Sequence, residues 1–154
     1  MVITIDGAAG VGKSSTAKEL AKRLGYKYFD TGAMYRAVTF YFLAENIDLE
    51  SNSQVIKSLS SIKLHIDFSF EKEMRIFLNE EDISLKIRSQ KVTSTVSTVS
   101  AIKEVREMMV KIQRSFTKDG NFVIEGRDIG TVVFPDAEHK LSLIHISEPT
   151  RLQQ

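Results

Sequence analysis

The 154-residue sequence contains no cysteine, no tryptophan and no long run of apolar residues. The absence of cysteine excludes a disulfide framework, a thiolate nucleophile and a cysteine-ligated zinc site. No apolar stretch approaches the length of a membrane span, and the chain does not open on a basic segment followed by an apolar run. We therefore expect a single-domain cytoplasmic protein with no membrane partner.

The chain also has no large excess of charge of one sign, because it contains 21 Lys and Arg residues and 20 Asp and Glu residues. This balance argues against a disordered tail and against a general nucleic-acid binder. The charge is uneven along the chain: residues 44–85 hold nine acids and four bases, whereas residues 86–118 hold eight bases and two acids. The basic block is either a solvated helix face or part of a site for an anionic substrate.

Hydrophobic periodicity predicts strands that alternate with helices. Strands are expected at 2–5, 28–29 and 122–124, with a fourth at 141–146, and helices at about 13–24, 33–45, 53–62 and, long or broken, 92–112. Apolar residues alternate with polar ones over 64–70 and 74–78, which predicts an antiparallel pair with 79–82 as the next turn. The fold class expected is α/β: a P-loop parallel sheet flanked by helices, with a small antiparallel insertion at about 62–85.

A glycine-rich loop follows the first predicted strand and precedes the first predicted helix. Residues 7–14 match the phosphate-binding pattern G-x-x-x-x-G-K-[ST] at every fixed position. Glycine lets backbone N–H groups approach phosphate oxygens, and the helix N-terminus adds a favourable dipole. Lys13 is suited to the β- and γ-phosphates, and the Ser14 hydroxyl to Mg²⁺. The predicted nucleotide-binding residues are Gly7, Ala8, Ala9, Gly10, Val11, Gly12, Lys13, Ser14 and Ser15.

The loop alone does not identify the acceptor of a phosphoryl group, because GTPases, motor ATPases and kinases share it. A GTPase should carry an Asn-Lys-x-Asp motif, which this sequence lacks. Glu125, at the end of the third predicted strand, is a weak candidate for the acid of a motor ATPase.

Two further polar segments, 30–36 and 126–131, each follow a predicted strand. In an open α/β sheet, ligands bind beyond the carboxyl ends of the strands. We therefore expect these segments to converge with residues 7–14 at one edge. Arg36, on the first turn of the predicted helix, is placed to hold a phosphate. A solvated surface explains Arg36 and Arg106 equally well when each is taken alone.

Four segments together resemble the bacterial cytidylate kinase family: DGAAGVGKSS, DTGAMYRAVT, IRSQKVTSTVSTVSAIKEVRE and EGRDIGTVVFPDA, in this order. The resemblance extends from residue 1 to about residue 140. It implies an ATP-dependent kinase with Mg²⁺ that converts CMP or dCMP to the diphosphate, and it implies a monomer. The insertion at 62–85 resembles the enlarged monophosphate-binding part of this family.

The resemblance also implies roles for individual residues. Arg36 and Arg127 would hold the phosphate of the acceptor, and with Lys13 they would neutralise the transferring charge. Cytosine would be recognised by Ser97, Arg106 and Asp128. The acceptor site would be lined by Thr31 and Tyr35. A carboxylate such as Asp128 can accept a hydrogen bond from the N4 amino group of cytosine.

The end of the chain departs from the family pattern. After Lys140 the sequence reads LSLIHISEPTRLQQ, where the family continues with a core strand, a helix and an arginine-rich lid. We therefore expect an incomplete cytidylate kinase core at 1–140, a non-family tail at 141–154 and impaired activity. An uncovered sheet face would favour self-association. The alternatives are a nucleotide-binding module without turnover and another small-molecule P-loop kinase, such as a UMP kinase.

Overall fold

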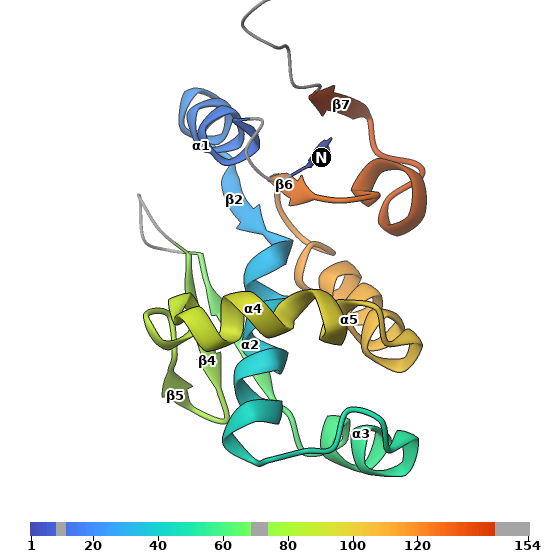
Figure 1. Ribbon diagram of the computed structural model, residues 1–154. Coiled ribbons are helices and arrows are strands. Elements are labelled where there is room, and N and C mark those ends of the chain that lie inside the picture. The colour runs from blue at the N-terminus through green and yellow to red at the C-terminus, as the bar shows by residue number, and fades with distance from the viewer. Residues whose placement is uncertain (9–11, 69–73, 144–154) are drawn as a thin grey trace, which may run out of the picture.

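The computed structural model describes residues 1–8, 12–68 and 74–143 (Figure 1). Its strands are β1 (Val2–Gly7), β2 (Lys27–Asp30), β3 (Leu64–Asp67), β4 (Arg75–Leu78), β5 (Glu81–Asp82), β6 (Phe122–Gly126) and β7 (His139–Leu143). Its helices are α1 (Lys13–Leu24), α2 (Thr31–Ala44), α3 (Asn52–Leu59), α4 (Gln90–Ser100) and α5 (Lys103–Phe116), with short helical turns η1 (Lys86–Arg88) and η2 (Ile129–Val133). Within the described ranges, none of the helices is both long and apolar enough to cross a membrane.

A parallel four-stranded sheet in the order β2-β6-β1-β7 forms the centre of the fold. Helix α1 covers one face and buries Ala17 and Ala21 against Ile3, Ile5 and Val123. The larger core lies on the other face and includes side chains of β2, β6, α2 and α5. The predicted α/β class, a parallel sheet flanked by helices, is confirmed.

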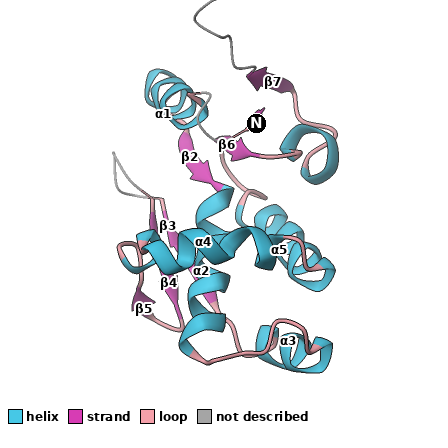
Figure 2. Ribbon diagram, viewed as in Figure 1, coloured by secondary structure: helices cyan, strands magenta, loops and turns pink. Residues whose placement is uncertain are grey.

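A small antiparallel sheet, β3-β4-β5, lies beside α2 and contributes to the same larger core as the parallel sheet (Figure 2). It confirms the antiparallel insertion predicted at about 62–85. The expected turn at 79–82 is shorter than predicted. Asn79 and Glu80 form it, both with positive φ (48° and 74°), and Glu81 and Asp82 then pair with β4 as β5.

The structure decides one helix boundary and moves another. Of the two alternatives for 92–112, a long helix or a broken one, the broken one is found, because α4 ends at Ser100 and the extended backbone of Ile102 precedes α5. Helix α2 begins at Thr31 rather than at residue 33, since the Asp30 side chain caps it by accepting a hydrogen bond from the Gly32 N–H at 2.9 Å. The fourth strand lies at 139–143, and residues 144–146 of the prediction are outside the described residues.

Candidate functional site

The three predicted loops leave adjacent strands at one edge of the parallel sheet. In the register of the sheet, Glu125 of β6 is paired with Ile5 of β1 on one side and with Asp30 of β2 on the other. Because all three strands run in the same direction, their following residues emerge together. The described parts of segments 7–14, 30–36 and 126–131 therefore lie at a common edge, as the sequence predicts.

The phosphate-binding loop is described at both of its ends, whereas Ala9, Gly10 and Val11 lie outside the described residues. Gly12 takes a left-handed conformation (φ 83°) and forms the N-cap of α1. This conformation favours glycine. Lys13 is half-buried and its Nζ donates to the Gly7 carbonyl at 3.0 Å. Ser14 and Ser15 follow on the exposed first turn of α1, where backbone N–H groups have no helical partners.

Glu125 lies beneath this helix turn and is 3% exposed. Its Oε1 accepts a hydrogen bond from the Ser14 hydroxyl at 2.7 Å, and its Oε2 is buried with no hydrogen-bond partner in the described part of the chain. Burial, and then the nearby Asp30 carboxylate, raise the pKa of Glu125, while Ser14, Tyr28 and Lys13 act in the opposite direction. The sheet therefore presents a buried acid to the serine of the phosphate loop.

Tyr28, which is half-buried, is a second titratable group at this position. Burial, followed by the charges of Asp30 and Glu125, raises the pKa of Tyr28 far above its ordinary value, so its hydroxyl stays protonated. The hydroxyl interacts with Ser14 and Glu125, although it does not bond to Glu125 Oε2 at standard geometry. Sequence reasoning assigned Tyr28 to a strand and did not connect it with the site.

The acceptor residues on α2 are held from two directions. The Thr31 hydroxyl is buried and donates to the Glu125 carbonyl at 2.8 Å, which joins the start of α2 to the end of β6. Arg36 lies in the second turn of α2, not in the first as expected, because the helix begins earlier. Its Nη1 donates to the Thr93 hydroxyl of α4 at 3.3 Å.

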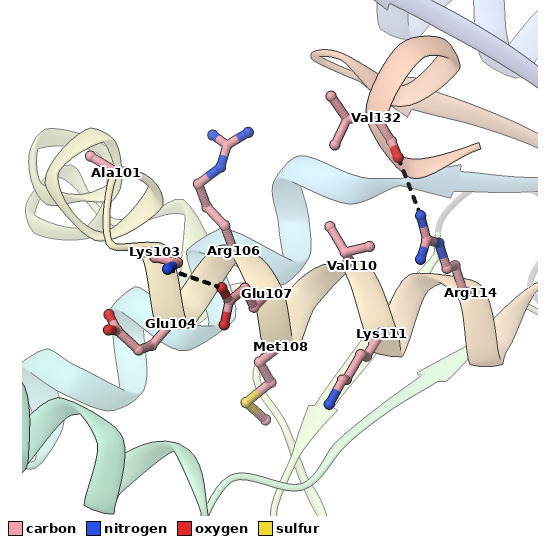
Figure 3. Close-up of a pocket in the computed structure, with 10 residues that line it drawn as sticks. All are labelled: Ala101, Lys103, Glu104, Arg106, Glu107, Met108, Val110, Lys111, Arg114 and Val132. Carbon is pink, nitrogen blue, oxygen red and sulfur yellow. Dashed lines mark hydrogen bonds and ion pairs between the residues drawn. The ribbon is translucent and has the colours of Figure 1, made fainter. Parts of the chain in front are cut away.

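Arg106 of α5 lies near Tyr35 of α2. Burial raises the pKa of the Tyr35 hydroxyl, and the positive charge of Arg106 partly opposes this shift. Arg106 also lines a cavity of about 740 Å³ along the outer side of α5, which extends to Ala101 and to Val132 of η2. In Figure 3, Arg106 extends from α5 toward the side on which Val132 lies. Ser97 is exposed on α4, one turn before Ala101.

Arg127 and Asp128 follow β6 and are both exposed. Asp128 has a left-handed backbone (φ 57°). Among the described residues, neither side chain forms a hydrogen bond or an ion pair, so both charged groups are open to a ligand.

Asp6 is the residue that sequence reasoning missed most clearly. Its carboxylate accepts hydrogen bonds from the backbone N–H groups of Ile129 and Gly130, at 2.6 and 2.8 Å. The sequence offered one signal, an acid directly before the first glycine of the phosphate loop. Its partners are more than 120 residues away, and no local pattern identifies them.

Comparison with known proteins gives independent evidence of the family to which the chain belongs. A family model described as cytidylate kinase matches residues 3–153. The chain is 50% identical over 141 residues to the cytidylate kinase of Caldanaerobacter subterraneus, covering 92% of this chain and 61% of that protein. It is 48% identical over 142 residues to the cytidylate kinase of Streptococcus uberis, covering 92% and 63%.

A longer relative carries the same region within a fused protein. The bifunctional pantoate ligase/cytidylate kinase of Prochlorococcus marinus is 46% identical over 142 residues, which cover 92% of this chain and 28% of that protein. The chain thus spans 61% and 63% of the two single-function cytidylate kinases above. The family match includes most of segment 141–154, whose status as a separate tail stays a prediction.

Proposed function

The chain belongs to the cytidylate kinase family, and from this premise we propose that it carries the donor and acceptor sites of an ATP-dependent (d)CMP kinase. In the reaction, an oxygen of the acceptor phosphate bonds to the γ-phosphorus of ATP and the bond to the β–γ bridging oxygen breaks. The products are ADP and CDP or dCDP. The observation that carries the proposal is the emergence of three anion-suited loops at one edge of the parallel sheet.

The donor site would be formed by the loop after β1. Lys13 would exchange the Gly7 carbonyl for the β- and γ-phosphate oxygens of ATP. The N-terminus of α1 would add backbone N–H donors and a positive dipole. The remaining residues of segment 7–15 would approach the phosphates through their backbone.

The residues around Ser14 fit Mg²⁺. Glu125 Oε2 is a buried carboxylate oxygen that has no hydrogen-bond partner among the described residues, and it lies beside a serine hydroxyl that can turn toward a cation. The described residues contain no group of three acidic or histidine side chains that could hold a metal. Mg²⁺ commonly binds through one or two protein groups together with substrate phosphates. When bound, it would neutralise charge on the phosphates.

The acceptor site would be formed by the loops after β2 and β6 together with α4 and α5. Arg36 and Arg127 would bind the phosphate of CMP, because guanidinium groups pair with phosphate oxygens through two hydrogen bonds. Asp128 would accept from the N4 amino group of cytosine, and Arg106 would donate to its N3 and O2 acceptors. Thr31, Tyr35 and Ser97 would complete the site. Uracil has a carbonyl at position 4, so UMP should bind more weakly.

Binding and turnover need separate tests, since the chain spans less than two thirds of the single-function relatives. Titration calorimetry of the 154-residue chain with CMP, dCMP and UMP measures acceptor binding. Phosphorus NMR of the chain with ATP, Mg²⁺ and CMP measures formation of CDP. We expect CMP to bind at least tenfold more tightly than UMP.

Arg127→Ala should weaken CMP binding, whereas Arg23→Ala is the matched control because Arg23 is exposed and paired with Glu19 on α1. Binding of CMP without formation of CDP would restrict the proposal to a nucleotide-binding module. Equal binding of CMP and UMP would contradict it. The monomeric state implied by the resemblance and the cytoplasmic location expected from the composition stay predictions.

A further inference from the structure

Asp6 joins the two loops that the proposed reaction needs to align. It lies at the end of β1, directly before Gly7, where the phosphate-binding loop begins. Its two carboxylate oxygens accept separate hydrogen bonds, Oδ1 from the Ile129 N–H at 2.6 Å and Oδ2 from the Gly130 N–H at 2.8 Å. Hydrogen bonds to a charged group are stronger than those between neutral groups.

These bonds act on the backbone next to the acceptor residues. Asp128, directly before Ile129, has φ 57°, a conformation that costs free energy for any residue except glycine. The side chains of Arg127 and Asp128 form no bonds of their own within the described residues. Their positions therefore depend on the backbone of this turn, and Asp6 holds that backbone.

The packing at Gly130 strengthens the connection. A Cβ atom at this position would lie 2.7 Å from the Thr4 hydroxyl oxygen and 3.2 Å from Asp6 Oδ2. The turn therefore lies directly against β1, with room for glycine alone. Strand β1 pairs with β6 in register from Val2 to Asp6. The contacts of Thr4 and Asp6 with Gly130 extend this alignment beyond the sheet.

We propose that Asp6 is a positioning residue of the acceptor site. By holding Ile129 and Gly130 against β1, it presents the preceding residues Arg127 and Asp128 to the acceptor at a fixed distance from the phosphate-binding loop. The proposal rests on the proposed function for the identity of the acceptor, a pyrimidine nucleoside monophosphate. It adds a residue that does not itself touch that acceptor.

Asp6→Asn tests the proposal, because it preserves size and removes one of the two acceptor oxygens. We expect CMP affinity to fall by roughly tenfold and the preference for CMP over UMP to narrow. Glu138→Gln is the matched control: the Glu138 carboxylate also accepts a backbone hydrogen bond, from the Val2 N–H at 3.0 Å, at the opposite end of β1. Titration calorimetry of both variants against CMP and UMP gives these values.

Amide hydrogen exchange provides a readout without any ligand. Asp6→Asn should speed the exchange of Ile129 and Gly130 by roughly tenfold, while the amides of α5 keep the wild-type rates. Unchanged exchange at these two amides, or CMP affinity within twofold of the wild type, would overturn the proposal. If the wild-type chain does not bind CMP, the proposed function fails, and the exchange rates still decide whether Asp6 holds the turn.

Discussion

At the scale of single residues, the buried Glu125 carboxylate lowers the stability of the folded chain, although it is one of the groups proposed to bind Mg²⁺. An ordinary glutamate titrates near 4.5, and burial followed by Asp30 raises the pKa of Glu125 in the folded chain. Between these two values the folded chain binds more protons than the unfolded chain, so the free energy of unfolding decreases as pH rises. Above the raised pKa, this loss of stability is complete.

Glu125→Gln should therefore stabilise the ligand-free chain at pH 8, with an advantage that shrinks toward pH 4.5. The Ser14 hydroxyl can still donate to the amide oxygen of the variant, so that bond is kept. Urea unfolding of both proteins between pH 4.5 and 8 measures the effect. Glu19→Gln is the control, because Glu19 is exposed on α1. Parallel stability profiles of the wild type and Glu125→Gln would contradict the prediction.

Asp128 allows a test of base recognition with little disturbance of the backbone. Asparagine tolerates the left-handed conformation that Asp128 adopts (φ 57°), and its amide can donate to a carbonyl as well as accept from an amino group. We expect Asp128→Asn to lower CMP affinity by about tenfold and to raise UMP affinity relative to CMP. Calorimetry against both nucleotides measures the ratio, with exposed Asp119→Asn as the control. An unchanged ratio would show that Asp128 does not recognise the base.

At the scale of elements, the sequence predicted those strands and helices whose positions are determined by interactions between residues close in the chain. The strand, glycine loop and helix at 2–24 were predictable because the phosphate-binding motif, the apolar run of the strand and the helical spacing of apolar residues all indicate the same arrangement. The sequence left open whether 92–112 forms one long helix or a broken one, since Val99, Ile102 and Val105 keep helical spacing across the break between α4 and α5. The Ala101 N–H instead bonds to Ser97 and the Ile102 N–H to Val99, which ends the helix without a proline or glycine.

The contacts of Asp6 and Tyr28 could not be predicted for a different reason. Both depend on which strands become neighbours in the sheet, and this order follows from tertiary packing. The common edge of residues 126–131 and 30–36 was predictable because each segment follows a strand, a property that sequence shows. The groups that hold these loops in place are distant in sequence and became visible with the structure.

Two glycines separate the effects of space and of backbone conformation on stability. A Cβ on Gly126 would lie 2.2 Å from the Thr31 hydroxyl oxygen and 2.8 Å from Ile129, whereas a Cβ on Gly25 would meet nothing within 4 Å. Gly25, the C-cap of α1, has φ 70°. Gly25→Ala should cost about 1 kcal/mol from conformation alone, and Gly126→Ala about 2–3 kcal/mol from overpacking.

Urea unfolding of the two glycine variants measures both costs. Thr31→Ala added to Gly126→Ala should recover part of the loss, since it removes the nearest obstructing atom, while the contacts with Ile129 remain. Equal costs for Gly25→Ala and Gly126→Ala would show that the start of α2 moves away from β6 without resistance.

At the scale of the whole molecule, β6 lies between the donor and acceptor halves of the proposed site. It pairs with β1, which leads to the phosphate-binding loop, and with β2, which leads to α2. Its side chains belong to both hydrophobic cores, Val123 on the α1 side and Phe122 and Ile124 on the other. A chain joined in this way should unfold as one cooperative unit.

Both nucleotides should therefore shift the same thermal transition. A ligand at 100 times its dissociation constant stabilises the folded state by about 2.7 kcal/mol, which is about 5–11 °C for a chain of this size. Differential scanning calorimetry with CMP, with ATP and Mg²⁺, and with UMP measures the shifts. Two separate transitions, each shifted by one ligand, would contradict a single unit built around β6. A shift with ATP and none with CMP would mean that the donor loop is formed while the acceptor residues require the remaining length found in the relatives.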